Sequence, residues 1–136
     1  MTTPKACILF IDDDLDMHLA IRAILGRDDY DVTCCRTGGE GMEQMRRVKP
    51  DLLLLDIMLA QPTEGIQVAC QMRQDSRLKD IPIIFISAVG ESCGSEYAQE
   101  VCPVALEADM FLDKPLEAAT VREAVQWVLQ QKKKTS

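Results

Sequence analysis

Four short apolar runs, spread along the whole chain, are the feature that most constrains its fold. They occupy residues 8–11, 52–55, 83–86 and 110–112. Each run is about as long as a buried β-strand and shows no alternation of polar and apolar residues. Strands of this kind are covered on both faces, which is typical of a parallel sheet between two layers of helices. The runs therefore predict an α/β fold.

Helical patterns separate these runs, and one further short strand is expected between the first two. The predicted strands are residues 6–12, 31–35, 51–56, 81–87 and 109–112. The predicted helices are residues 15–26, 38–48, about 66–74, about 95–101, and a last one that starts near 117 or 120. Alternating strands and helices imply parallel pairing with right-handed crossovers. We therefore expect a three-layer, doubly wound, five-stranded parallel sheet.

The helical periodicity also predicts which residues face the core. In the first helix the expected buried stripe is Leu15, Leu19, Ala23 and Ile24, with Gly26 near the helix end. His18, the single histidine, is expected to be an ordinary, partly exposed side chain. The last helix is expected to bury Val121, Ala124, Val125 and Val128, to begin with a capping box at Thr120 and Glu123, and to fray at the lysines 132–134.

Length and charge limit the classes of function. The 136 residues fit one domain, which we place at 6–131, followed by a basic tail at 132–136. The net charge of −7 argues against direct binding of nucleic acid or of anionic membranes. The start of the chain lacks the pattern of a signal peptide, and no apolar stretch is long enough to span a bilayer. We expect a cytoplasmic protein whose six cysteines are reduced.

Polar residues stand where the apolar runs end. Asp12 and Asp13 close the first run, Asp56 closes the second, Ser87 closes the third, and the fourth leads to Lys114. Because the carboxyl ends of parallel strands meet at one crevice, we expect these side chains to lie together. A buried carboxylate is unfavourable unless it is paired, protonated or bound to a metal. A cluster of carboxylates with a hydroxyl and an ammonium suits a divalent cation and a phosphoryl group.

Four separated motifs resemble the receiver domains of two-component response regulators, the CheY-like fold. They are ILFIDDD at residues 8–14, LLDIML at 54–59, ISA at 86–88 and ADMFLDKP at 108–115. The likeness covers residues 6–131 and implies the strand order 2-1-3-4-5. It also implies a signalling module that takes a phosphoryl group from a histidine kinase or phosphotransfer protein. Such a module catalyses only its own phosphorylation and dephosphorylation, so we do not expect an enzyme.

Carried over residue by residue, the resemblance implies these roles. Asp56 is the phosphoacceptor. Asp13, Asp56 and the main-chain carbonyl of Met58 bind Mg²⁺ directly, and Asp12 holds the metal through water. Ser87 binds a phosphoryl oxygen, and Lys114 pairs with the phosphoryl group. Ser87 and Phe111 form the switch that alters a protein-binding surface.

Two intervals are longer than is usual in that family, the one from Asp56 to Gly65 and the one from Ser87 to Lys114. The extra residues of the second interval fall within the segment 88–108, and they predict an unusual output surface. A receiver that acts as a scaffold without phosphorylation is therefore one alternative. Another is a phosphatase of the haloacid-dehalogenase type, with Asp12 as nucleophile and Asp14 as acid and base.

Overall fold

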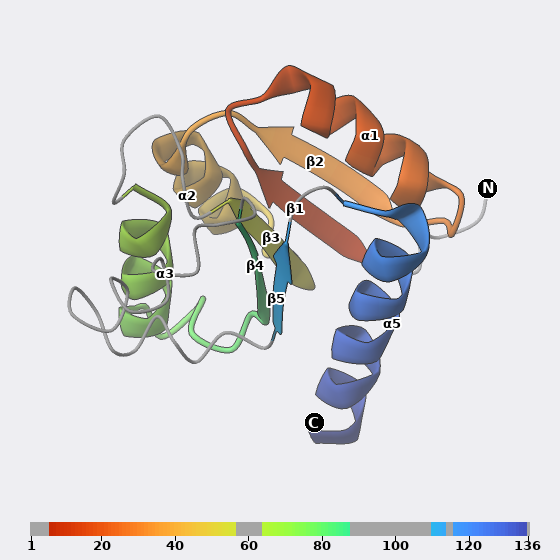
Figure 1. The fold of residues 1–136 in the computed structure, drawn as a ribbon. Helices are drawn as coiled ribbons and strands as arrows, with labels where there is room; N and C mark the ends of the chain where they lie inside the picture. The colour runs from red at the N-terminus through yellow and green to blue at the C-terminus, as the bar shows by residue number, and fades with distance from the viewer. Residues whose placement is uncertain (1–5, 57–63, 88–109, 114–115, 136) are drawn as a thin grey trace.

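One parallel sheet of five strands runs through the middle of the protein (Figure 1). The computed structural model describes residues 6–56, 64–87, 110–113 and 116–135. The strands are β1 (Cys7–Ile11), β2 (Asp31–Cys35), β3 (Leu52–Asp56), β4 (Ile83–Ser87) and β5 (Met110–Asp113). Their order across the sheet is β2-β1-β3-β4-β5, and every neighbouring pair is parallel. The predicted fold class and strand order are confirmed.

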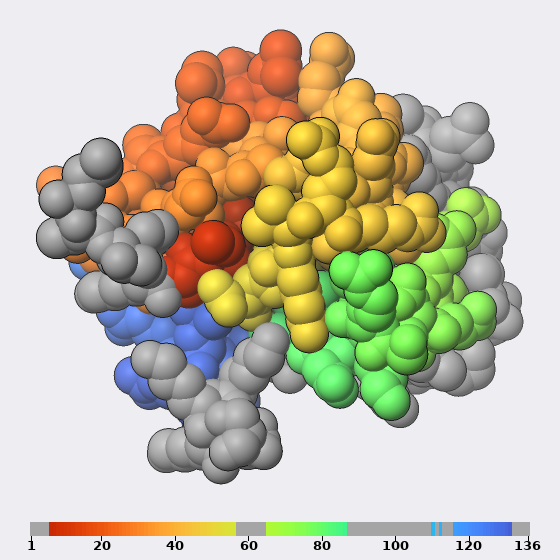
Figure 2. All heavy atoms as spheres, turned by 180° about the vertical axis from the view of Figure 1, so that it is seen from behind, coloured from red at the N-terminus to blue at the C-terminus, as the bar shows by residue number. Residues whose placement is uncertain are grey.

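Helices cover both faces of this sheet. They are α1 (Leu15–Gly26), α2 (Gly38–Arg47), α3 (Glu64–Gln74) and α5 (Ala118–Thr135). Figure 1 shows α1 and α5 on one face and α2 and α3 on the other. From behind, the yellow and green atoms of the segments that include α2 and α3 meet on the surface (Figure 2). The helix predicted at 95–101 lies outside the described residues.

Successive residues of each central strand enter opposite layers of the core. In β1, Leu9 and Ile11 pack with residues of α2 and α3, whereas Ile8 and Phe10 pack with residues of α1 and α5. All four side chains are buried. This two-sided burial explains why the strands read as continuous apolar runs rather than alternating ones.

The buried face of α1 differs from the predicted one. Leu15 and Leu19 are 54% and 68% exposed, and the buried residues of the helix are His18, Ile21 and Leu25. The predicted stripe is therefore wrong, and so is the expectation that His18 is partly exposed. The face of α1 that packs on the sheet carries His18, Ile21 and Leu25, and not Leu15 and Leu19.

The last helix keeps its predicted buried face and starts next to Glu117, one of its two predicted starts, but the predicted cap at Thr120 and the predicted end are wrong. Val121, Ala124, Val125 and Val128 are all buried, as expected. The helix starts at Ala118, so Thr120 lies inside it and does not cap it, and it continues to Thr135 instead of fraying at the lysines. An ion pair between Arg122 and Asp28, with Nε to Oδ2 at 2.8 Å, links α5 to the turn after α1.

The cysteines only partly meet the expectation that all of them are thiols. Cys7, Cys34 and Cys35 are free. Cys70, on α3, takes part in a disulfide, so the expectation is wrong for this residue. Within the described part of the chain, no helix combines the length and apolar character that crossing a membrane requires.

Candidate functional site

The carboxyl ends of β1 and β3 lie side by side in the centre of the sheet. Phe10 pairs with Leu54 and Ile11 pairs with Leu55. An aspartate follows each of these two pairs of residues, Asp12 directly after β1 and Asp56 as the last residue of β3. The register of two apolar strands thus brings these two carboxylates to the same edge of the sheet.

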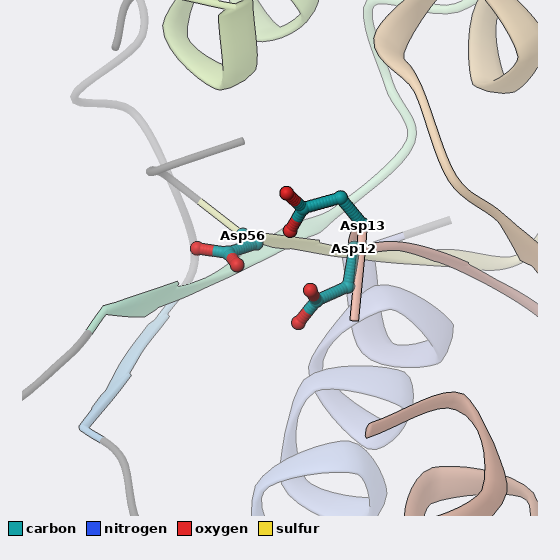
Figure 3. A group of neighbouring side chains, drawn as sticks. All are labelled: Asp12, Asp13 and Asp56. Atoms are coloured by element: carbon teal, nitrogen blue, oxygen red, sulfur yellow. The ribbon is translucent and has the colours of Figure 1, made fainter. Parts of the chain in front are cut away.

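Asp13 completes a group of three acids at this edge. One carboxylate oxygen from each of Asp12, Asp13 and Asp56 can be chosen so that all three atoms lie within 4.8 Å of one another. Figure 3 shows Asp12 and Asp13 leaving the end of β1 with their carboxylates turned toward the side where Asp56 lies. The predicted acidic cluster is therefore present in the structure.

Burial adds to the electrostatic cost of placing three carboxylates together. Asp12 is 0% exposed and Asp56 is 3% exposed, whereas Asp13 is open to solvent. Two carboxylates are thus removed from water while a third stands within reach, and the three negative charges repel one another. A bound cation relieves both costs. Every donor in the group is a carboxylate oxygen, which suits a hard divalent cation such as Mg²⁺ better than a soft metal.

Hydrogen bonds hold Asp12 in place. Its backbone N–H donates to the carbonyl of Cys35, at the end of β2, at 3.0 Å. Its Oδ1 accepts from the backbone N–H of Asp14 at 2.9 Å. Its carbonyl oxygen lies 2.5 Å from Nε2 of His18. Asp12 is therefore anchored to β2 and α1 as well as to its own strand.

Asp14 and Asp16 do not belong to the acidic group. Asp14 is the N-cap of α1, where its side chain accepts from the backbone N–H of Asp16 at 2.9 Å. Asp16 lies in the first turn, where a negative charge is favoured by the helix dipole. Because Asp14 is occupied as a cap, the structure gives no support to its use as the acid and base of a phosphatase.

The structure describes the remaining predicted site residues only in part. Ser87 ends β4, the neighbour of β3, and its backbone pairs with Asp113 of β5. The backbone of Phe111 pairs with Phe85. The side chains of Ser87 and Phe111, and the whole of Met58 and Lys114, lie outside the described residues, so their predicted roles stay predictions.

Sequence reasoning missed His18, which the structure places beneath the acidic group. The signal that finds it is the spacing of the buried residues of α1. His18, Ile21 and Leu25 lie three and four positions apart, which is one face of a helix. If the buried face of the helix is assigned from Ile21 and Leu25 instead of from Leu15 and Leu19, His18 falls on that buried face.

A family model for the response regulator receiver domain matches residues 8–126. The chain belongs to this family. As a receiver domain it resembles the alkaline phosphatase synthesis transcriptional regulatory protein PhoP of Bacillus subtilis, with 31% identity over 122 residues, which are 90% of this chain and 48% of that protein. It also resembles the polar-differentiation response regulator DivK of Brucella anthropi, with 32% identity over 85 residues, 62% of this chain and 68% of that protein.

Solved structures share the fold of this receiver domain. A CheY-like receiver domain protein from Methanospirillum hungatei has a TM-score of 0.83 at 22% identity, and the match covers 98% of this chain and all of that one. A response regulator from Chloroflexus aurantiacus, described as putative, has a TM-score of 0.82 at 26% identity and covers 94% of this chain and 99% of its own. The receiver domain spans about half the length of the transcriptional regulators among its first curated relatives.

Proposed function

We propose that this receiver domain is a Mg²⁺-dependent phosphoacceptor that carries the phosphoryl group on Asp56. The observation that carries the proposal is the acidic cluster at the ends of β1 and β3, in which Asp56 is almost fully buried beside Asp12. A carboxylate in such a place needs a cation to neutralise its neighbours before it can approach a second anion.

The residues divide the work between holding the cation and handling the phosphoryl group. Asp13, Asp56 and the main-chain carbonyl of Met58 would hold Mg²⁺, with Asp12 acting through a water molecule. These are oxygen donors, and Mg²⁺ usually keeps several waters beside them. When bound, the ion supplies positive charge that offsets the negative charge of the phosphoryl oxygens.

In the transfer itself, a carboxylate oxygen of Asp56 attacks the phosphorus atom of the donor. A phosphorus–oxygen bond to Asp56 forms while the bond from phosphorus to the donor breaks. The electron pair of the broken bond stays with the donor; a phosphohistidine whose other ring nitrogen is protonated leaves as a neutral imidazole. Ser87 donates a hydrogen bond to a phosphoryl oxygen, and Lys114 pairs with the phosphoryl group as a point charge.

Phosphorylation then biases a two-state equilibrium. Ser87 moves toward the new phosphoryl oxygens, and the ring of Phe111 fills the space that it leaves. The result is a changed protein-binding face near the last strands and helices. Under this proposal the chain transfers phosphate only to and from itself, so it is not an enzyme with a separate substrate.

The proposed phosphodonor is a histidine kinase or a phosphotransfer protein, and the downstream target is another protein. A donor that draws on ATP places the chain in the cytoplasm. The net charge of −7 supports a module that does not itself bind nucleic acid, because phosphate backbones need a surplus of Lys and Arg.

Intact-protein mass spectrometry after incubation with acetyl phosphate tests the proposal. We expect one phosphoryl adduct that forms only with Mg²⁺, disappears in Asp56→Asn, and persists in Asp16→Asn. Asp16 is the matched control because it is an exposed acid on α1 outside the cluster.

Two other outcomes favour the alternatives. If no adduct forms with acetyl phosphate or with a histidine-kinase donor, the chain is a scaffold that works without phosphorylation. If the protein instead turns over a phosphate ester in a way that depends on Asp12 and not on Asp56, it is a phosphatase.

A further inference from the structure

The single histidine of the chain is buried directly behind the acidic cluster. His18 is 7% exposed and lies on the core-facing side of α1 with Ile21 and Leu25. Its ring meets the ring of Phe10 edge-on, with centroids 5.6 Å apart and planes at 69°. An imidazole is an unfavourable filler for an apolar core unless its polar atoms are hydrogen-bonded.

The partner of the imidazole is the backbone of the site. Nε2 of His18 lies 2.5 Å from the carbonyl oxygen of Asp12. A carbonyl oxygen can only accept, so Nε2 carries the hydrogen and donates it. That carbonyl belongs to the peptide unit that joins Asp12 to Asp13, and both of these residues contribute a carboxylate to the cluster.

This contact constrains the backbone on the far side of Asp12. The N–H of Asp12 donates to Cys35, which fixes the peptide unit before Asp12. The hydrogen bond from His18 fixes the peptide unit after Asp12. Together they set the direction in which Asp12 and Asp13 leave the sheet, because the side-chain directions follow from the backbone dihedrals on either side.

We propose that His18 is a positioning residue for the cation, which orients the Asp12–Asp13 peptide so that both carboxylates face Asp56. The inference rests on the proposed Mg²⁺ function and extends it to a residue with no direct contact with the ion. Residues that orient metal ligands through hydrogen bonds commonly change metal affinity when they are replaced.

A matched pair of substitutions separates positioning from packing. His18→Gln and His18→Met introduce unbranched side chains of nearly equal size and similar helix propensity. Only glutamine keeps an N–H donor at the reach of Nε2. Ile21→Val is the control for a buried change on the same face of α1, at an aliphatic core residue that is not one of the three acids.

Isothermal titration with MgCl₂ gives the readout. We expect His18→Met to weaken Mg²⁺ binding about tenfold, His18→Gln to restore affinity close to the wild-type value, and Ile21→Val to lower thermal stability while leaving Mg²⁺ affinity unchanged. Equal affinity in the methionine and glutamine variants overturns the proposal. A wild type that binds no Mg²⁺ contradicts the proposed function itself, so the two failures are distinguishable.

A second measurement uses the wild type alone, so it tests the proposal even if the methionine variant does not fold. Because the chain has one histidine, a long-range ¹H–¹⁵N spectrum contains one imidazole from the protein. We expect this spectrum to show Nε2 protonated without metal, and the ring resonances to shift on Mg²⁺ addition with the midpoint seen by calorimetry. If Nε2 carries no proton, or if the ring resonances do not shift when Mg²⁺ is added, the positioning role is refuted.

Discussion

Neutralising Asp13 should make the metal-free protein more stable and the response to Mg²⁺ weaker. Its carboxylate oxygen lies within 4.8 Å of oxygens from both Asp12 and Asp56. At that separation two unit charges repel by about 0.9 kcal/mol in bulk water and by about 3.5 kcal/mol at an effective dielectric of 20. Because Asp13 is exposed, the lower figure applies, and two neighbours give a total of about 2 kcal/mol before salt screening.

The same change removes a proposed ligand. At a Mg²⁺ concentration of about 100 times the dissociation constant, binding stabilises the folded state by about 2.7 kcal/mol. If Asp13→Asn weakens binding tenfold, the same concentration adds only about 1.4 kcal/mol. The variant therefore begins about 2 kcal/mol more stable than the wild type, and at this Mg²⁺ concentration that advantage shrinks to about 0.7 kcal/mol.

Urea denaturation at low ionic strength, with and without MgCl₂, measures both effects on one protein. Asp16→Asn is the control, because it removes an exposed acid from the first turn of α1 outside the cluster. It should lower stability by about 0.3–1 kcal/mol through the helix dipole and leave the Mg²⁺ response intact. An Asp13→Asn protein that is destabilised without metal, or that gains as much from Mg²⁺ as the wild type does, refutes the reasoning.

Two further predictions concern packing and pH. A Cβ at Gly41 would lie 2.1 Å from Cδ1 of Ile11, so Gly41→Ala should lower the free energy of unfolding, measured with urea, by about 1–3 kcal/mol. A Cβ at Gly39, on the same helix, meets nothing within 4 Å, so Gly39→Ala should raise that free energy by about 0.5–1 kcal/mol. Burial, then the nearby Glu40, raises the pKa of the Cys35 thiol above its usual 9.0. Since this thiol ionises first in the unfolded chain, its contribution to stability is complete below pH 9.0 and is lost as the pH rises through the folded pKa. Between pH 7 and pH 10, the free energy of unfolding should therefore fall less in Cys35→Ala than in the wild type. An equal fall in both proteins contradicts the assignment.

The sheet and its acidic edge were predictable because both depend on local pattern. The apolar run that ends at Ile11 fixes where β1 stops, and the parallel register then places Asp12 beside Asp56. The burial of α1 was not predictable in the same way. Leu15 and Leu19 form an apolar pair in sequence but face outward, because the helix phase depends on how α1 rests on the sheet.

The same limit explains why the histidine was missed. A buried imidazole next to a carbonyl is visible only when the backbone of one element is placed against the side chains of another. Helical or strand periodicity does not connect His18 with Asp12, because His18 lies on a helix and Asp12 follows the end of a strand. The acids of the site are thus set by register, whereas the residue that supports them is set by packing.

Asp12 shows why this support matters for the proposed chemistry. Its backbone is bonded to β2 through Cys35 and to α1 through His18, and its side chain accepts from Asp14 while lying beside Asp56. These bonds tie the end of β1 to its neighbours, so the packing of the surrounding elements holds the carboxylates close to one another despite their repulsion. In the proposed function, donors that are gathered by the fold in this way reduce the free energy that cation binding would spend on reorganisation. Under the proposed function, cation binding offsets the repulsion among the acids, so Mg²⁺ affinity and the stability of the strand ends should change together and can be measured together.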